Sequence, residues 1–148
     1  MNSFIYDIPV KVYFGKDQLC HLGEELQKYG KRVLLTYGGG SIKRIGLYDK
    51  VIAELQDHGF EVFELSGIEP NPRIESVREG VRICKEKNID VLLAVGGGST
   101  IDATKFMAAG ACVDHDPWDF FNEKKATTKR FKSLANKYYF DSPYNSYH

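Results

Sequence analysis

Short apolar runs alternate with segments of mixed polarity along most of the chain. Apolar runs are typical of strands buried on both faces of a sheet, and they predict strands at residues 32–37, 60–65 and 89–95. Residues 10–14 alternate between apolar and polar positions and predict a further strand. Apolar residues at helical spacing predict helices over residues 16–29, 42–58, 73–87 and 100–110. Strands that alternate with helices predict an α/β fold, in which helices cover both faces of a Rossmann-like, mostly parallel sheet of four or more strands.

A nine-residue pattern occurs twice, at Val33–Ser41 and at Val91–Ser99. Each copy is an apolar run followed by three glycines and a serine, and each precedes a predicted helix. Glycines let a ligand approach the backbone without meeting a Cβ atom, and the serine stands where a helix N-cap is expected. The free N–H groups at a helix N-terminus attract anions. Two such turns after parallel strands predict that the carboxyl edge of the sheet binds one large phosphorylated ligand, for which a dinucleotide is the obvious candidate.

Length and composition fit one globular domain. The chain has 148 residues, of which 43% are hydrophobic. Lys plus Arg and Asp plus Glu both number 20, so the net charge favours neither a nucleic-acid nor a membrane partner. No apolar segment reaches the ~20 residues of a membrane span, and residues 1–9 do not resemble a signal peptide. Three widely spaced cysteines without a C-x-x-C pair indicate neither a zinc site nor a disulfide framework, and we expect a cytoplasmic protein.

Four segments of the chain resemble the iron-containing alcohol dehydrogenases. The run from Gly96 to Lys105 is similar to the G-G-G-S-x-x-D-x-x-K signature of that family. Residues 9–15, 69–72 and 116–120 resemble three further family segments, so the resemblance covers about residues 4–122. The Y-G-G-G-S segment that ends at Ser41 resembles the NADPH-dependent butanol dehydrogenase or aldehyde reductase branch.

The resemblance implies a two-domain oxidoreductase of small alcohols or aldehydes. In that family an N-terminal α/β domain carries the nicotinamide cofactor, and a helical domain holds iron or another divalent metal through one Asp and three His. We therefore expect residues 1–122 to form the dinucleotide-binding α/β domain. Residues 123–148 are rich in Lys, Thr, Ser, Asn and Tyr, and we expect an atypical, poorly ordered tail there. Because the helical metal domain is missing from the sequence, we expect a truncated or frameshifted product that is inactive by itself.

The glycine turns and the resemblance together define an expected NADP(H) site. Its expected cofactor-binding residues are Gly38, Gly39, Gly40, Ser41, Lys43, Arg44, Asn71, Pro72, Gly96, Gly97, Gly98, Ser99 and Asp102. Gly38 stands where NAD-using members of the family have an Asp, and the missing carboxylate removes the repulsion of a 2′-phosphate. Lys43 and Arg44 lie in the first turn of the next predicted helix and offer that phosphate positive charge.

Each assignment has a purely structural alternative. Glycine turns also make tight strand–helix connections, and Lys43 and Arg44 are equally suited to a solvated helix surface. Ser99 and Asp102 have the spacing of a capping box, and Lys105 has the spacing of an ion-pair partner of Asp102.

The sequence assigns no catalytic and no metal-binding residue. His21 and His58 are expected on the surface, and the three consecutive residues Asp114–Asp116 are a poor metal site because neighbours in sequence rarely converge on one ion. Trp118 and the following aromatics are expected in the core or at a domain interface. Two other functions stay open, and a homo-oligomer through exposed faces is compatible with either. One is a non-catalytic remnant that only binds the dinucleotide, and the other is a relative of glycerol dehydrogenase or dehydroquinate synthase, against which the Y-G-G-G-S segment argues.

Overall fold

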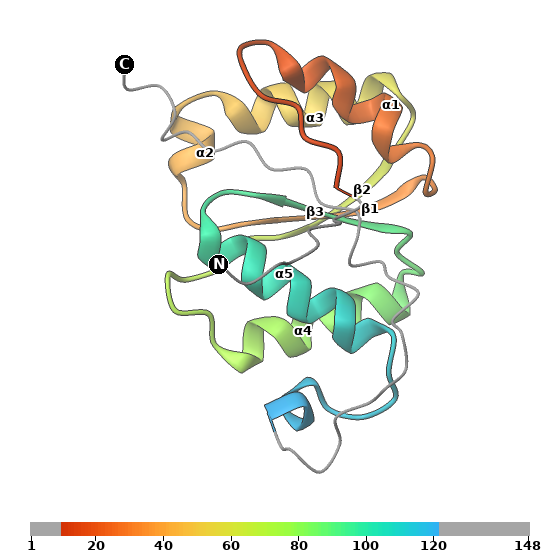
Figure 1. Cartoon of the computed structure of the whole chain (residues 1–148), viewed down its shortest axis with the longest axis vertical. Coiled ribbons are helices and arrows are strands. Elements are labelled where there is room, and N and C mark those ends of the chain that lie inside the picture. Colours follow the sequence, from red (N-terminus) through yellow and green to blue (C-terminus); the bar gives the residue numbers. More distant parts are fainter. Residues whose placement is uncertain (1–9, 122–148) are drawn as a thin grey trace, which may run out of the picture.

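The computed structural model describes residues 10–121, which form a sheet between two layers of helices (Figure 1). The sheet has three parallel strands, β1 (Arg32–Tyr37), β2 (Glu61–Leu65) and β3 (Val91–Val95). Their order is β2-β1-β3, so β1 lies in the middle. The predicted α/β fold with a parallel sheet and helices on both faces is confirmed.

The helices divide between the two faces of the sheet. One face carries α1 (Leu22–Leu26), α2 (Ser41–Arg44) and α3 (Leu47–Asp57), and the other carries α4 (Ile74–Glu86) and α5 (Gly98–Ala111) (Figure 1). Two short 3-10 helices, η1 (Gln18–His21) and η2 (Pro117–Phe121), precede α1 and follow α5.

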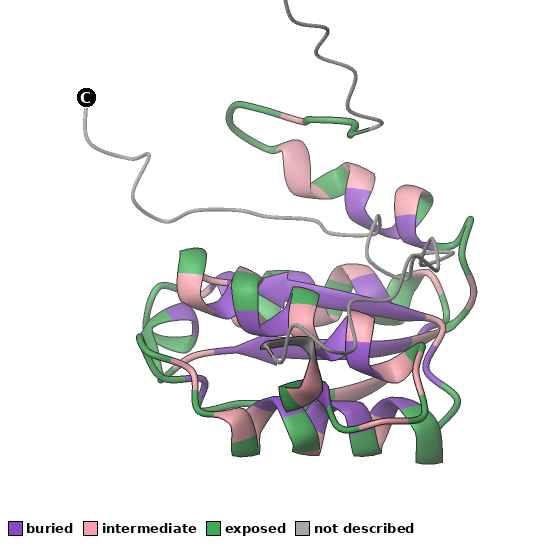
Figure 2. Ribbon diagram, turned by 60° about the horizontal axis from the view of Figure 1, so that its bottom comes forward, coloured by how far each residue is buried: buried purple, intermediate pink, exposed green. Residues whose placement is uncertain are grey.

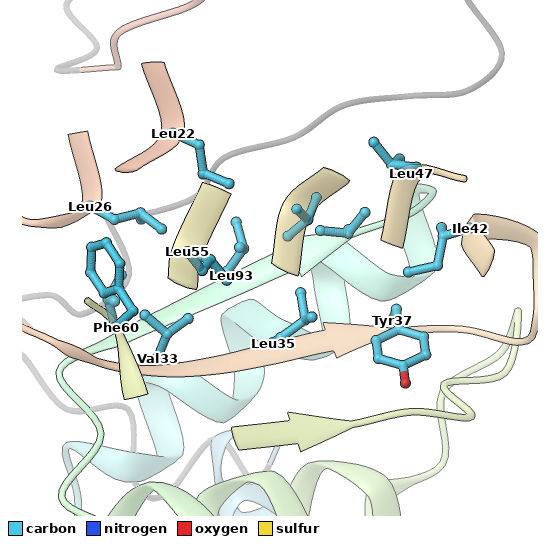
Figure 3. Close-up of a cluster of buried hydrophobic side chains, with 13 residues drawn as sticks. Leu22, Leu26, Val33, Leu35, Tyr37, Ile42, Leu47, Leu55, Phe60 and Leu93 are labelled. Atoms are coloured by element: carbon cyan, nitrogen blue, oxygen red, sulfur yellow. The ribbon is translucent and has the colours of Figure 1, made fainter. Parts of the chain in front are cut away.

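Each face of the sheet has its own hydrophobic core, because successive strand residues point to opposite faces. Val33, Leu35 and Tyr37 of β1 pack beneath α1, α2 and α3, in the cluster that Figure 3 shows. Leu34 of β1 and Leu92 of β3 pack on the other side with α4 and α5. β3 is therefore buried throughout and β1 from Val33 onward (Figure 2), which is why they occur in the sequence as apolar runs rather than as alternating patterns.

The strand predicted at residues 10–14 does not form. Its three apolar side chains are between 61% and 80% exposed, and the segment pairs with none of the strands that the structure describes. Two of its polar side chains instead bind α1: the Lys11 ammonium lies 2.7 Å from Oε1 of Glu25, and the Tyr13 hydroxyl donates to the same oxygen at 2.6 Å. Alternation predicts a strand only where a partner strand is available, and the described part of the sheet has three strands instead of the predicted four or more.

Two predicted helices are interrupted by left-handed residues. Gly46 has a φ of 75°, which a right-handed helix excludes, so the predicted helix 42–58 is divided into α2 and α3. Asp17 has a φ of 60°, and the predicted helix 16–29 is reduced to η1 and α1. The predicted strands 32–37, 60–65 and 89–95 and the predicted helices 73–87 and 100–110 agree with the structure to within two residues at each end.

Several expectations concern residues near the ends of the chain. Trp118, expected in the core or at a domain interface, is 51% exposed, which excludes the core and leaves the interface as a prediction. The bounds of the expected 1–122 domain and the expected tail 123–148 lie outside the described residues.

Candidate functional site

The two glycine turns lie side by side at the carboxyl edge of the sheet. β1 and β3 are adjacent and parallel, and Tyr37 at the end of β1 pairs with Val95 at the end of β3. Gly38 and Gly96 therefore leave neighbouring strands at the same edge, as the repeated sequence pattern predicted. A ligand placed across this edge can touch both turns at once.

The chain reverses its direction of strand addition between these two turns. From β1 it passes over the α3 face to β2, then returns over the α4 face to β3 on the opposite side of β1 (Figure 1). Right-handed crossovers that proceed in opposite directions must use opposite faces, so the two outgoing turns diverge. In open α/β sheets this divergence leaves a crevice at the carboxyl ends of the strands, which is the usual ligand position.

The second turn presents the uncapped N-terminus of α5. The helix begins at Gly98, its N-cap residue is Gly97, and no side chain caps it. The first hydrogen bond of the helix runs from the Ile101 amide to the Gly97 carbonyl at 3.2 Å, so the amides of residues 98–100 come before it and have no acceptor within the helix. A Cβ atom added to Gly97 or Gly98 would meet no heavy atom within 4 Å, so the backbone is open to a ligand here. This arrangement suits an anion.

Gly96 has a different reason to be glycine. Its φ is 152°, and a Cβ atom there would lie 2.9 Å from the Thr100 hydroxyl oxygen. A buried chain of hydroxyls continues from this point: Thr104 donates to the Thr100 carbonyl at 2.7 Å and lies 2.6 Å from the hydroxyl of Thr36 on β1. The start of α5 is thus attached to the central strand by hydrogen bonds as well as by packing.

Both serines after the glycines differ from their predicted roles. Ser99 is the second residue of α5 instead of its N-cap, and its hydroxyl donates to the Pro70 carbonyl. The capping box with Asp102 is therefore wrong. Ser41 is the first residue of α2, whose N-cap is Gly40, and it caps nothing. In both turns the N-cap residue is a glycine, and the helix starts one or two residues earlier than a serine cap would allow.

The Ser99 hydrogen bond brings the proline-containing loop to the second turn. Pro70 is followed by Asn71, which is exposed, and Pro72, which is half-buried, so both predicted loop residues lie close in sequence to the atom that Ser99 binds. Asp102 is exposed on the next turn of α5, and no ion pair joins it to Lys105, although the structure describes both residues.

The first turn borders a pocket of about 250 Å³. Its lining consists of Tyr37, Gly38, Gly39, Gly40, Lys43, Ser66 and Gly67. The Gly67 amide donates to the Gly38 carbonyl at 2.8 Å and fixes one wall. A Cβ atom at Gly38 would lie 3.1 Å from the Ile68 carbonyl oxygen, whereas Gly39 has open space in that direction. The predicted residues Ser41 and Arg44 are exposed next to the pocket without lining it.

Several residues of this region were missed at the sequence level. Ser66 and Gly67 follow β2 and reach the pocket because β2 pairs with β1. A small residue and a glycine after an apolar run are the same signal that marked the other two turns, so the sequence did contain a pointer to them. Tyr48 and Glu64, which contact Tyr37 at this edge, have no such signal.

The described residues do not gather a set of metal ligands. Within residues 10–121 no three His, Cys, Asp or Glu side chains are placed to share one ion. His21 stacks on Tyr13 with ring centroids 4.5 Å apart, and His58 lies 3.0 Å from the Glu54 carbonyl oxygen, so the histidines belong to different surroundings. None of the helices in this part of the chain combines the length and apolar character that a bilayer crossing needs.

Comparison with known proteins identifies the family of the chain. Residues 9–135 match the family described as iron-containing alcohol dehydrogenase. The chain is 59% identical over 124 residues to the probable NADH-dependent butanol dehydrogenase 1 of Bacillus subtilis, covering 84% of this chain and 32% of the relative. It is 53% identical over 129 residues to the NADH-dependent butanol dehydrogenase A of Clostridium acetobutylicum, covering 87% and 33%. It is 44% identical over 120 residues to the NADPH-dependent aldehyde reductase YqhD of Escherichia coli, covering 80% and 30%.

A solved structure agrees with these sequence relatives. The NADH-dependent butanol dehydrogenase A of Thermotoga maritima superposes with a TM-score of 0.78 at 43% identity, over 82% of this chain and 31% of that structure. The chain thus spans about a third of the length of the relatives it matches. The matches confirm the family that the glycine-rich motifs resembled, and the chain belongs to the iron-containing alcohol dehydrogenases.

Proposed function

We propose that this chain is the cofactor-binding part of an NAD(P)H-dependent dehydrogenase of small alcohols or aldehydes. The observation that carries the proposal is the pairing of two open glycine turns on adjacent strands at the point where the strand order reverses. The names of the relatives, butanol dehydrogenases and an aldehyde reductase, support the same class of reaction.

The residues of this edge fit a dinucleotide. The amides at the start of α5 would bind the pyrophosphate, next to Gly97, Gly98 and Ser99, and the pocket at Gly38–Gly40 would hold the adenosine half. Asp102, with Asn71 and Pro72 of the proline-containing loop, would lie towards the nicotinamide. When bound, the nicotinamide supplies or accepts the hydride, and this part of the chain contributes binding and orientation.

Within this function we propose a preference for NADPH over NADH. Gly38 brings no carboxylate to the pocket, and Lys43 in its lining brings a positive charge. Ser41 and Arg44 add a hydroxyl and a second cation beside it. Relatives between 51% and 59% identical are named NADH-dependent, and one that is 44% identical is named NADPH-dependent. The proposed preference therefore rests on the residues of the first turn and not on the names of the relatives.

The family's metal does not fit the described residues. Its implied ligand set of one Asp and three His has no counterpart in residues 10–121, where no three potential ligands come together. We propose that the 148-residue chain binds cofactor without reducing aldehydes itself. Residues 1–122 as a single cofactor domain remain part of the proposal.

Titration calorimetry of the purified chain with NADPH and with NADH tests the binding proposal. Gly98 is the most informative residue to replace, because a side chain there has free space in the fold but would stand where we propose that the phosphate lies. We expect the Gly98→Leu variant to unfold at the temperature of the wild type. Its affinity for both nucleotides should fall at least about tenfold, which is the effect of losing one charge-assisted phosphate contact. Gly98→Ala should weaken them less.

A leucine on a distant surface provides the matched control. Ala53 is exposed on α3, and Ala53→Leu should change neither affinity nor unfolding temperature by a measurable amount. A folded wild-type chain that binds neither nucleotide, or a Gly98→Leu variant that binds both as the wild type does, would overturn the proposal.

A further inference from the structure

A lysine, two tyrosines and a glutamate form one cluster beside the pocket of the first glycine turn. The Lys43 ammonium lies 4.7 Å from the ring centroid of Tyr48 and 5.5 Å from that of Tyr37. The two rings meet edge to face with centroids 5.7 Å apart. Both tyrosine hydroxyls donate to Glu64 of β2, the Tyr37 bond measuring 3.2 Å. Figure 3 shows the Tyr37 hydroxyl directed towards this neighbouring strand.

Glu64 fixes the tyrosines, and the tyrosines restrain the lysine. Each carboxylate oxygen of Glu64 accepts one hydroxyl, so neither ring is free to turn away. The hydrogen bond to Glu64 is also the main cause that raises the pKa of Tyr48 to about 12, so the phenol remains a neutral donor at physiological pH. Within residues 10–121 no carboxylate forms an ion pair with Lys43, and its charge is held over aromatic faces instead.

This restraint matters because lysine is a flexible residue. An unrestrained Lys43 would have to give up the freedom of four side-chain bonds to meet an anion in the pocket, which lowers affinity. A charge already held at the pocket lining avoids most of that loss. A carboxylate partner would restrain the lysine equally well but would neutralise it, whereas an aromatic face leaves the positive charge available to a phosphate.

We propose that Tyr48 and Glu64 are positioning residues for Lys43, and that this cluster sets the preference of the chain for a nucleotide that carries a 2′-phosphate. The inference rests on the proposed function, in which the pocket holds the adenosine half of the cofactor. It adds two residues that do not line the pocket themselves. Tyr48 contacts the lining residues Lys43 and Tyr37, and Glu64 accepts a hydrogen bond from each tyrosine.

The experiment compares two probes on the full 148-residue chain, 2′,5′-ADP and 5′-AMP, by titration calorimetry. The ratio of their dissociation constants reports the 2′-phosphate, and a general structural defect would change both constants alike. We expect the wild type to prefer 2′,5′-ADP and Lys43→Met to lose most of that preference. Tyr48→Leu, which removes the ring, should reduce the ratio by about two- to fivefold, the range of an exposed cation–π contact. Tyr48→Phe keeps the ring and loses only the bond to Glu64, so its effect should be smaller.

Tyr13 supplies a matched control. Its hydroxyl also donates to a glutamate, Glu25, and the Lys11 ammonium lies 5.9 Å from its ring. Glu25 belongs to α1, so this second tyrosine–glutamate–lysine group is not part of the pocket. Tyr13→Leu should leave the ratio unchanged. If Lys43→Met lowers the ratio and neither Tyr48 variant does, the positioning role is refuted while the proposed function stands. If the folded wild type binds neither probe, the proposed function fails and this inference fails with it.

Discussion

Replacing Gly38 by aspartate is the most direct test of how the first turn selects its cofactor. A charge-assisted contact to the 2′-phosphate is worth ~1.5–3 kcal/mol, so we expect the wild-type chain to bind NADPH about ten- to a hundredfold more tightly than NADH. Gly38→Asp places a carboxylate in the pocket lining, where the phosphate charge would lie. The variant should bind NADH more tightly than NADPH.

The expected change in nucleotide affinity depends on how strongly solvent screens the two charges and on the space at Gly38. Two unit charges 4 Å apart repel by ~1 kcal/mol in water and by ~4 kcal/mol near a protein surface, which is sufficient to cancel the wild-type preference and then to reverse it. The new Cβ atom would lie 3.1 Å from the Ile68 carbonyl oxygen, so the neighbouring loop must move by a few tenths of an ångström. Gly38 is not among the described residues with positive φ, and no backbone strain adds to this cost.

Two companion variants separate charge from crowding. Gly38→Ala has the crowding without the charge, and it should weaken NADPH and NADH by the same factor. Gly39→Asp has the charge without the crowding, because no heavy atom lies within 4 Å of a Cβ atom there. Calorimetric titration of all four proteins with both nucleotides gives the ratio of dissociation constants for each. Equal affinities in the wild type, or the same ratio in Gly38→Asp as in Gly38→Ala, would refute the reasoning and leave Lys43 as a solvated surface residue.

Three further predictions follow from other parts of the structure. Gly110→Ala should lower the free energy of unfolding in urea by ~1–3 kcal/mol, because the added Cβ atom would lie 2.7 Å from Val81 and 2.9 Å from Pro117. An unchanged or higher stability would show that α4 and η2 move to make room for it. A thiol reagent at pH 8 should label Cys20 and Cys112 quickly and Cys84 only after denaturation, because burial raises the pKa of the Cys84 thiol to about 12 and keeps it protonated; three fast thiols would contradict this. The purified 148-residue chain should not oxidise NADPH in the presence of butanal and Fe²⁺, because residues 10–121 gather no metal ligands to polarise a carbonyl, and butanal-dependent loss of NADPH absorbance in a preparation free of host dehydrogenases would overturn this.

The elements that the sequence predicts well are those whose burial is settled by the sheet itself. β1 and β3 are covered on both faces, so nearly every position must be apolar, and the runs at residues 33–35 and 91–95 leave little ambiguity. Residues 10–14 show the limit of the same reasoning. Their alternation is typical of a strand, but a strand also needs a neighbouring strand to accept and donate its backbone hydrogen bonds. The sequence of a segment does not show whether such a neighbour is present. Gly46 shows another limit, since one left-handed residue divides a helix without disturbing the apolar period around it.

The candidate site also has a part that the sequence predicts and a part that it does not. The two turns were predictable because each is a local pattern, and the parallel sheet then brings both to one edge. The cluster of Lys43, Tyr48 and Glu64 depends on the pairing of β2 with β1 and on the path of α3, which are relations between distant segments. No local pattern in the sequence encodes them.

The serines that follow the two glycine turns do not cap the helices. A serine after a glycine turn is an ordinary signal for a helix N-cap, and in both copies of the repeated pattern that signal is wrong. Had Ser99 capped α5, its hydroxyl would have taken one of the free amides at the helix start. It binds the Pro70 carbonyl instead, and the amides of residues 98–100 have no acceptor within the helix. Glycine at an N-cap costs only a few tenths of a kcal/mol relative to serine, so this chain leaves its anion-binding amides open at little expense in stability. A local rule of helix formation thus fails at the position where, in the proposed function, the cofactor phosphate takes the place of the cap.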